Sequence, residues 1–173
     1  MQPTARRFAF AILSFTILAL AFAPAAFAAR DWTAVASTGA IDGSSLGFFS
    51  FSGPTLTYLS GSLSTAPVIA RYNVTNTFDN NANPDQPGWT ALELGYTNPA
   101  GGAAITATLF QVDPCTGVQI ALCTVNAAVA TNTCSICTFA PVIDFSRHLY
   151  YVQVTLTRPN NALFPTAKTL RIF

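Results

Sequence analysis

The stretch Val68-Ile69-Ala70-Arg71-Tyr72-Asn73-Val74-Thr75 decides the fold class of this chain. Apolar side chains stand at positions 68, 70, 72 and 74, and polar side chains stand at 71, 73 and 75. Successive side chains of a β-strand point to opposite faces of the sheet. A period of two therefore predicts a strand with one buried and one exposed face.

The same period recurs along the rest of the chain. In residues 150–157 it places Tyr150, Val152, Val154 and Leu156 inward and Tyr151 outward. Strands are also predicted at 89–96, 105–112, 118–125 and 168–173, with shorter candidates at 32–37, 46–51, 55–59 and 134–139. The turn residues 113–117 separate two alternating runs and predict a β-hairpin over 105–125. No window keeps the 3.6-residue period of a helix. The sequence thus predicts an all-β fold, a single antiparallel β-sandwich of jelly-roll or immunoglobulin-like type with about eight to ten short strands.

Residues 1–28 have the pattern of a secretory signal peptide. Arg6 and Arg7 form a positive start, an apolar run covers residues 8–23, and Ala26-Phe27-Ala28 supplies the small-x-small cleavage pattern. No later stretch is long and apolar enough for a transmembrane helix. We therefore expect a signal peptide at 1–28 and one secreted domain at 29–173, located in the extracellular space, at the cell surface or in the periplasm.

The charge pattern excludes some classes of partner. Arg6 and Arg7 are two of the eight basic residues, so the chain after the leader is close to neutral, and Lys168 is its only lysine. Nucleic-acid binding needs clustered Lys and Arg, and none is present. We expect no nucleic-acid partner, and an extracellular protein or a glycan as the ligand, with self-association as a further option.

Four cysteines stand at Cys115, Cys123, Cys134 and Cys137. An even number in an exported domain predicts two disulfides. The preferred pairing is Cys123 with Cys134 across a hairpin and Cys115 with Cys137, while the other pairings stay open. Cys134-Ser135-Ile136-Cys137 is also half of a zinc knuckle or a redox motif. The seven residues between Cys115 and Cys123 do not fit a second C-x2-C pair, so neither a metal nor a redox role is preferred.

One pattern suggests catalysis. Gly43-Ser44-Ser45-Leu46-Gly47 matches the G-x-S-x-G motif of serine hydrolases, and Asp144 and His148 follow in the matching order. The motif needs its serine between a strand and a helix, whereas a strand-like run follows here. Since His148 and Glu93 are also the only histidine and glutamate, we predict no catalytic residues and no enzyme activity.

Two features point to ligands. Asp79, Asn81, Asn83 and Asp85 alternate in the longest polar loop and offer oxygen atoms of the kind Ca²⁺ prefers, although an EF-hand glutamate is missing. No cofactor is required by the sequence, and Ca²⁺ at the Asp79–Asp85 loop is the one candidate. The aromatic side chains that could stack on a sugar are Trp32, Trp89 and Tyr151. Asn73-Val74-Thr75 matches the N-glycosylation sequon and predicts that Asn73 is exposed.

These observations favour a non-catalytic secreted module that acts as a surface, matrix, adhesion or structural component. The second hypothesis is a carbohydrate-binding module that uses Trp89, Trp32 and Tyr151 beside Asp79 and Asp85. The third is an exported serine hydrolase that uses Ser45 and His148.

Overall fold

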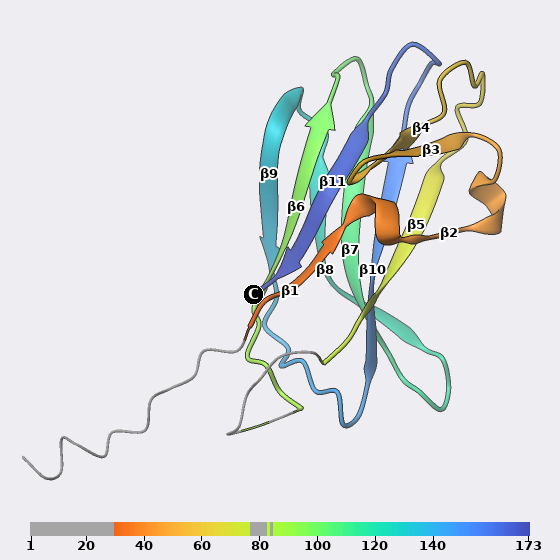
Figure 1. Cartoon of the computed structure of the whole chain (residues 1–173). Coiled ribbons are helices and arrows are strands. Elements are labelled where there is room, and N and C mark those ends of the chain that lie inside the picture. Colours follow the sequence, from red (N-terminus) through yellow and green to blue (C-terminus); the bar gives the residue numbers. More distant parts are fainter. Residues whose placement is uncertain (1–29, 77–82, 84) are drawn as a thin grey trace, which may run out of the picture.

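Two antiparallel β-sheets pack face to face in the computed structural model (Figure 1). The structure describes residues 30–76, 83 and 85–173. Its only helical segments in these ranges are two short 3-10 turns, η1 (Ala36–Thr38) and η2 (Gly43–Ser45). The predicted all-β sandwich is therefore confirmed.

One sheet has the strand order β3-β4-β11-β6-β9, with β1 also paired to β11. We call it sheet A. Its strands are β1 (Trp32–Val35), β3 (Phe49–Ser52), β4 (Thr55–Tyr58), β6 (Ala91–Asn98), β9 (Thr131–Thr138) and β11 (Thr166–Ile172). The other sheet, sheet B, has the order β2-β5-β10-β7-β8. Its strands are β2 (Ala40–Ile41), β5 (Val68–Val74), β7 (Ala104–Val112), β8 (Gln119–Ala127) and β10 (Leu149–Thr157).

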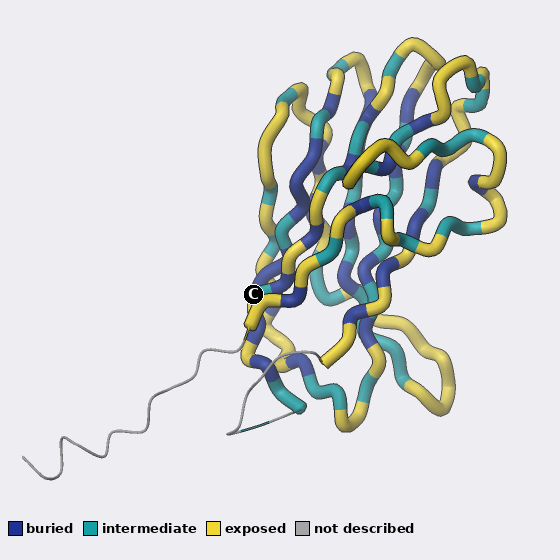
Figure 2. The backbone as a smooth tube through the Cα atoms, in the orientation of Figure 1, coloured by how far each residue is buried: buried dark blue, intermediate teal, exposed yellow. Residues whose placement is uncertain are grey.

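The core lies between the sheets and follows the alternation in the sequence. Burial alternates along β5 and β10, so Val68, Ala70, Tyr72 and Val74 face inward, as do Tyr150, Val152, Val154 and Leu156. Figure 2 shows the same alternation of buried and less buried positions along the strands, with exposed residues concentrated in the turns. Burial of these apolar side chains holds the two sheets together.

Each of the ten strand ranges predicted from the sequence overlaps an observed strand, and the predicted hairpin is the pair β7–β8. Its turn is closed by Gly117, whose φ of 70° suits glycine. The sequence missed β2, because two residues are too few to show a period. The predicted signal peptide lies outside the described residues. No helix in the part of the chain that the structure describes is long and apolar enough to cross a membrane.

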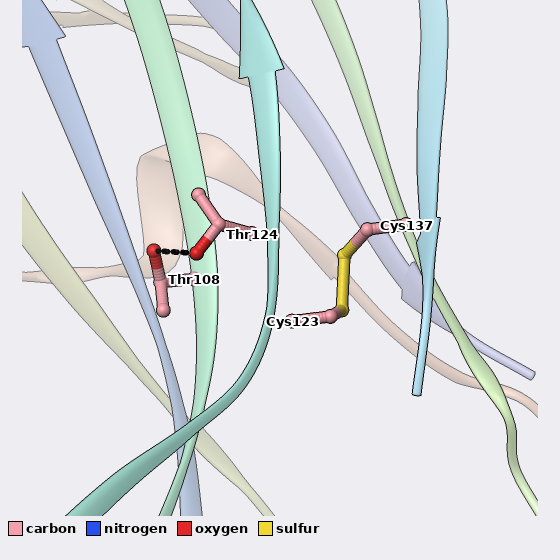
Figure 3. Close-up of a disulfide and its surroundings, with 4 residues drawn as sticks. All are labelled: Thr108, Cys123, Thr124 and Cys137. Atoms are coloured by element: carbon pink, nitrogen blue, oxygen red, sulfur yellow. Dashed lines mark hydrogen bonds between the residues drawn. A yellow bond between two sulfur atoms is a disulfide. The ribbon is translucent and has the colours of Figure 1, made fainter. Parts of the chain in front are cut away.

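The cysteine prediction needs correction. The disulfide joins Cys123 of β8 to Cys137 of β9 (Figure 3). Cys115 and Cys134 are exposed and free. The structure therefore has one disulfide among the described residues, with neither of the preferred pairings. Strands β8 and β9 belong to different sheets, so the bond links sheet B to sheet A at one edge of the sandwich. Cys134 cannot take the place of Cys137, because positions three apart on a strand point to opposite faces.

Arg158 directly follows β10 and connects two loops at that end of the sandwich; it is only 3% exposed. Its guanidinium lies 3.9 Å from the centre of the Tyr58 ring. It donates five hydrogen bonds of 2.8–3.2 Å to the backbone carbonyls of Ser62, Ser64, Asn161 and Leu163. Arg158 thus ties the loop between β4 and β5 to the loop between β10 and β11.

Candidate ligand-binding surface

The outward face of sheet B carries a row of side chains across four strands. Tyr151 of β10 pairs with Asn73 of β5 on one side and with Phe110 of β7 on the other. Phe110 in turn pairs with Ala121 of β8. Because directly paired residues of neighbouring strands share a face, these four side chains lie side by side on the outer surface.

Tyr151 and Phe110 form a flat aromatic pair in this row. Their ring centres are 5.0 Å apart and their planes differ by 17°, which is a stacked arrangement. The Tyr151 hydroxyl donates a hydrogen bond of 2.5 Å to Oε1 of Gln119. Stacking and this hydrogen bond fix the orientation of the Tyr151 ring, so little side-chain freedom remains to be lost when a ligand binds.

Two aliphatic side chains extend the aromatic pair toward the β7–β8 turn. Leu149 is 59% exposed and pairs directly with Val112 across β10 and β7. Both lie two positions from the aromatic residues of their strands and therefore on the same face. We call Phe110, Val112, Leu149 and Tyr151 the outer-face platform. A contiguous apolar surface of this kind, rimmed by polar groups, is typical of an interaction site.

The groups around the platform are polar but uncharged. Asn73 is exposed, as the sequon predicted, and Gln119 is exposed as well. Beyond the aromatic row, the hydroxyls of Thr108 and Thr124 share a hydrogen bond, drawn in Figure 3, with 3.0 Å between the oxygen atoms. The nearest charged side chain in the strand register is Arg71, whose paired neighbour on β10 is Gln153.

Arg71 does not give this surface a free charge. Its Nη1 lies 2.6 Å from Oδ2 of Asp42. Hydrogen bonds from Ser44, followed by the contact with Arg71, lower the pKa of the Asp42 carboxyl to about 2. The charges of Arg71 and Asp42 therefore compensate each other at neutral pH, and the platform offers apolar area together with amide and hydroxyl groups.

The two tryptophans predicted as stacking residues are buried instead. Trp32 is 6% exposed and Trp89 is 3% exposed. Trp89 donates from Nε1 to the carbonyl oxygen of Arg30 at 3.0 Å and meets Phe145 edge to face. The inward side of β1 holds Trp32, which belongs to the same core. Of the three predicted aromatic residues, only Tyr151 is placed to meet a ligand from solvent.

Part of the predicted calcium loop is described. Asp79 and Asn81 lie outside the described residues. Asn83 donates from Nδ2 to Oε1 of Gln86 at 2.8 Å, and the Asp85 carbonyl accepts from the amide of Phe145 at 2.9 Å. Within the described ranges no three His, Cys, Asp or Glu side chains are grouped to hold a metal ion. Calcium binding by Asp79 and Asp85 stays a prediction.

The serine-hydrolase hypothesis does not fit the structure. Ser45 lies in η2 and is fully buried. Its hydroxyl donates to the Pro67 carbonyl at 3.3 Å and accepts from the Ile69 amide at 2.9 Å. The loop between β9 and β10, which carries Asp144 and His148, lies at the end of the sandwich opposite to the start of β5, where Ser45 is bound (Figure 1). Ser45 therefore has a structural role in anchoring the start of β5 and is not an exposed nucleophile.

Sequence reasoning missed Phe110, Val112, Leu149 and Gln119. Tyr151 and Phe110 are far apart in the chain, and only the register between β10 and β7 brings them together. One signal was available, because Phe110 and Val112 fall on the opposite face of their strand from the inward residues Ile105, Ala107 and Leu109. Large apolar residues that lie together on the outward side of a strand indicate an interaction surface.

No protein-family model matches the sequence, and no curated protein is similar to it. Several solved structures resemble the fold at a distance. The CBM36-1 domain of a multidomain xylanase from the hindgut metagenome of Trinervitermes trinervoides has a TM-score of 0.48 and 10% identity, over 83% of this chain and 97% of that domain. The carbohydrate-binding module CBM36 in complex with calcium and xylotriose has a TM-score of 0.44 and 14% identity, over 83% of this chain and 99% of that module. The infectious bursal disease virus Gx strain structure has a TM-score of 0.37 and 15% identity, over 83% of this chain and 32% of that chain. Since all three TM-scores are below 0.5, we infer nothing about the ligand from them.

Proposed function

We propose that this chain is an exported, non-catalytic module that binds neutral glycans through the outer-face platform. The observation that carries the proposal is the stacked pair of Tyr151 and Phe110 on the outward face of sheet B. Such a module would attach the protein to a polysaccharide surface. This is the adhesion or matrix role that the composition favours.

The chemistry of the surface matches a sugar. A pyranose ring presents a face of C–H groups that packs on a flat aromatic ring, and its hydroxyls need amide and hydroxyl partners. Tyr151 and Phe110 supply the flat apolar area, and Asn73 and Gln119 supply amides beside it. Arg71, the charged side chain nearest to Tyr151 in the strand register, is paired with Asp42, so no free cation of β5 attracts an acidic glycan to the aromatic pair.

The test is a screen of the chain on a panel of neutral and acidic oligosaccharides, followed by variants. Tyr151→Ala should weaken binding of the best glycan at least tenfold, or about 1.4 kcal/mol. Phe51→Ala is the matched control, since Phe51 is a 41% exposed aromatic residue on β3 of the other sheet. It should leave the affinity unchanged.

Two results would refute the proposal. The first is that a correctly folded chain binds none of the glycans. Capture of a protein partner through the same platform would then indicate protein adhesion instead. The second is glycan binding that Tyr151→Ala leaves intact, because the ligand would then sit elsewhere.

A further inference from the structure

A hollow lies at the end of the sandwich that carries the β7–β8 turn, on the opposite face of this hairpin from the platform. It has a volume of about 310 Å³ and is lined by Gln111, Asp113, Thr116, Val118, Ile120 and His148. Gln111 and Ile120 pair across β7 and β8, and Gln111 also pairs with the inward-facing Tyr150. The hollow therefore opens on the inner side of sheet B.

Apolar side chains form one wall of this hollow. Ile120, on the inward side of β8, is 56% exposed, and Val118, two positions earlier and just before β8, is 58% exposed. Figure 1 shows the reason, because the β7–β8 hairpin projects past the end of sheet A. Sheet A therefore does not cover Val118 and Ile120. The polar side chains of Gln111, Asp113 and His148 lie next to them.

An ionised carboxylate forms part of the opposite wall. Oδ1 of Asp113 accepts from the backbone amides of Cys115 at 2.9 Å and Thr116 at 2.8 Å. These bonds, that of Thr116 first, together with nearby His148, lower the pKa of Asp113. No salt bridge in the described part of the chain includes Asp113. Its negative charge is therefore available to a ligand.

The imidazole of His148 also lines the hollow and carries a nitrogen atom without a hydrogen-bond partner in the described part of the chain. Its Nδ1 is buried and has no hydrogen-bond partner among the described residues. The large majority of buried side-chain polar atoms in proteins are hydrogen-bonded. An unpaired buried atom on a side chain that lines a hollow therefore distinguishes this end of the sandwich from the packed core.

We infer that this hollow binds the primary ammonium group of an aliphatic amine. The ammonium would pair with the carboxylate of Asp113, and its further N–H donors match the oxygen atoms of Gln111 and Thr116. The aliphatic stem would pack on Val118 and Ile120. Two sources share this chemistry, a free amine and a lysine side chain of a peptide. The site does not depend on the glycan-binding proposal.

The test is a titration of the ¹⁵N-labelled chain followed by NMR. The amides of Cys115 and Thr116 are the reporters, since both donate to Asp113. Pentylammonium should shift them with a dissociation constant of about 1–10 mM, whereas pentanol and pentanoate should bind at least tenfold more weakly. N-acetyl-lysine amide distinguishes a lysine side chain from a free amine by binding as tightly as, or more tightly than, pentylammonium.

The variant Asp113→Asn keeps an oxygen acceptor for the two amides and removes the charge. It should weaken binding of pentylammonium at least tenfold. The control is Asp144→Asn, because Asp144 accepts the Ser146 amide in the same way but does not line the hollow. Equal binding of pentanol and pentylammonium, unchanged binding by Asp113→Asn, or no shift at about 100 mM ligand overturns the inference.

Discussion

Replacing Arg158 with methionine is predicted to lower the free energy of unfolding by about 3–5 kcal/mol. A hydrogen bond to a charged group contributes about 1.5–3 kcal/mol, and Arg158 makes five. The four loop carbonyls that lose their donor recover part of this loss by turning toward water. The expected loss is therefore about 3–5 kcal/mol, which is less than the sum over five bonds. Methionine keeps the apolar stem, so the packing against Tyr58 is largely retained.

Guanidinium chloride unfolding followed by circular dichroism measures this change, with the slope m as a check that the denatured state is unaltered. Arg171→Met is the matched control. Arg171 also lies over an aromatic ring, that of Phe173 at 4.5 Å, but its side chain is 45% exposed and pairs with Asp31 at the surface. We expect less than about 1 kcal/mol there. A loss below about 1 kcal/mol for Arg158→Met would refute the view that Arg158 holds the two loops.

Three further predictions concern stability. Cys123→Ser removes the bond that closes a sequence separation of 14 residues and should cost about 3 kcal/mol relative to the oxidised wild-type chain, measured by chemical denaturation; the reduced wild type should match the variant, and equal stability of the variant and the oxidised chain would contradict this role of the disulfide. Gly39→Ala should destabilise by about 1–3 kcal/mol, because a Cβ would stand 2.6 Å from Cζ of the buried Tyr72; an unchanged melting temperature would contradict the packing described. Asp42 has a lowered pKa of about 2, chiefly through Ser44, so its contribution to stability is present above its unfolded pKa of about 3.8 and is lost as the pH falls toward 2. Melting curves of Asp42→Asn should accordingly lose part of the acid sensitivity that the wild type shows between pH 4 and 2, and an identical pH dependence in both would contradict this assignment.

The strands could be predicted because their signal is local. Alternation along 68–75 and 150–157 is produced by neighbours in the chain that face opposite sides of a sheet. The sandwich followed from the number and length of such runs. The order of the strands and their register depend on contacts between distant segments, and a single sequence does not carry them.

The candidate site residues could likewise be predicted only where the signal is local. Tyr151 was assigned to an outward face correctly, but its partner Phe110 depends on the register between β10 and β7. Trp89 was expected beside a polar loop and is buried, because the core takes up large aromatic area wherever a partner for the indole N–H exists. The cysteine pairing failed because the segment between β8 and β9 changes sheets, so Cys123 meets Cys137 across the sandwich edge.

The central claim is that a neutral glycan lies on the rings of Tyr151 and Phe110. The most direct measurement is a map of NMR shift changes over the whole chain, including aromatic side chains, during titration with the best glycan of the screen. We predict that the largest changes fall on the ring signals of Tyr151 and Phe110 and on the side-chain amides of Asn73 and Gln119. Changes confined to sheet A or to the loops, with these signals unmoved, would contradict the account.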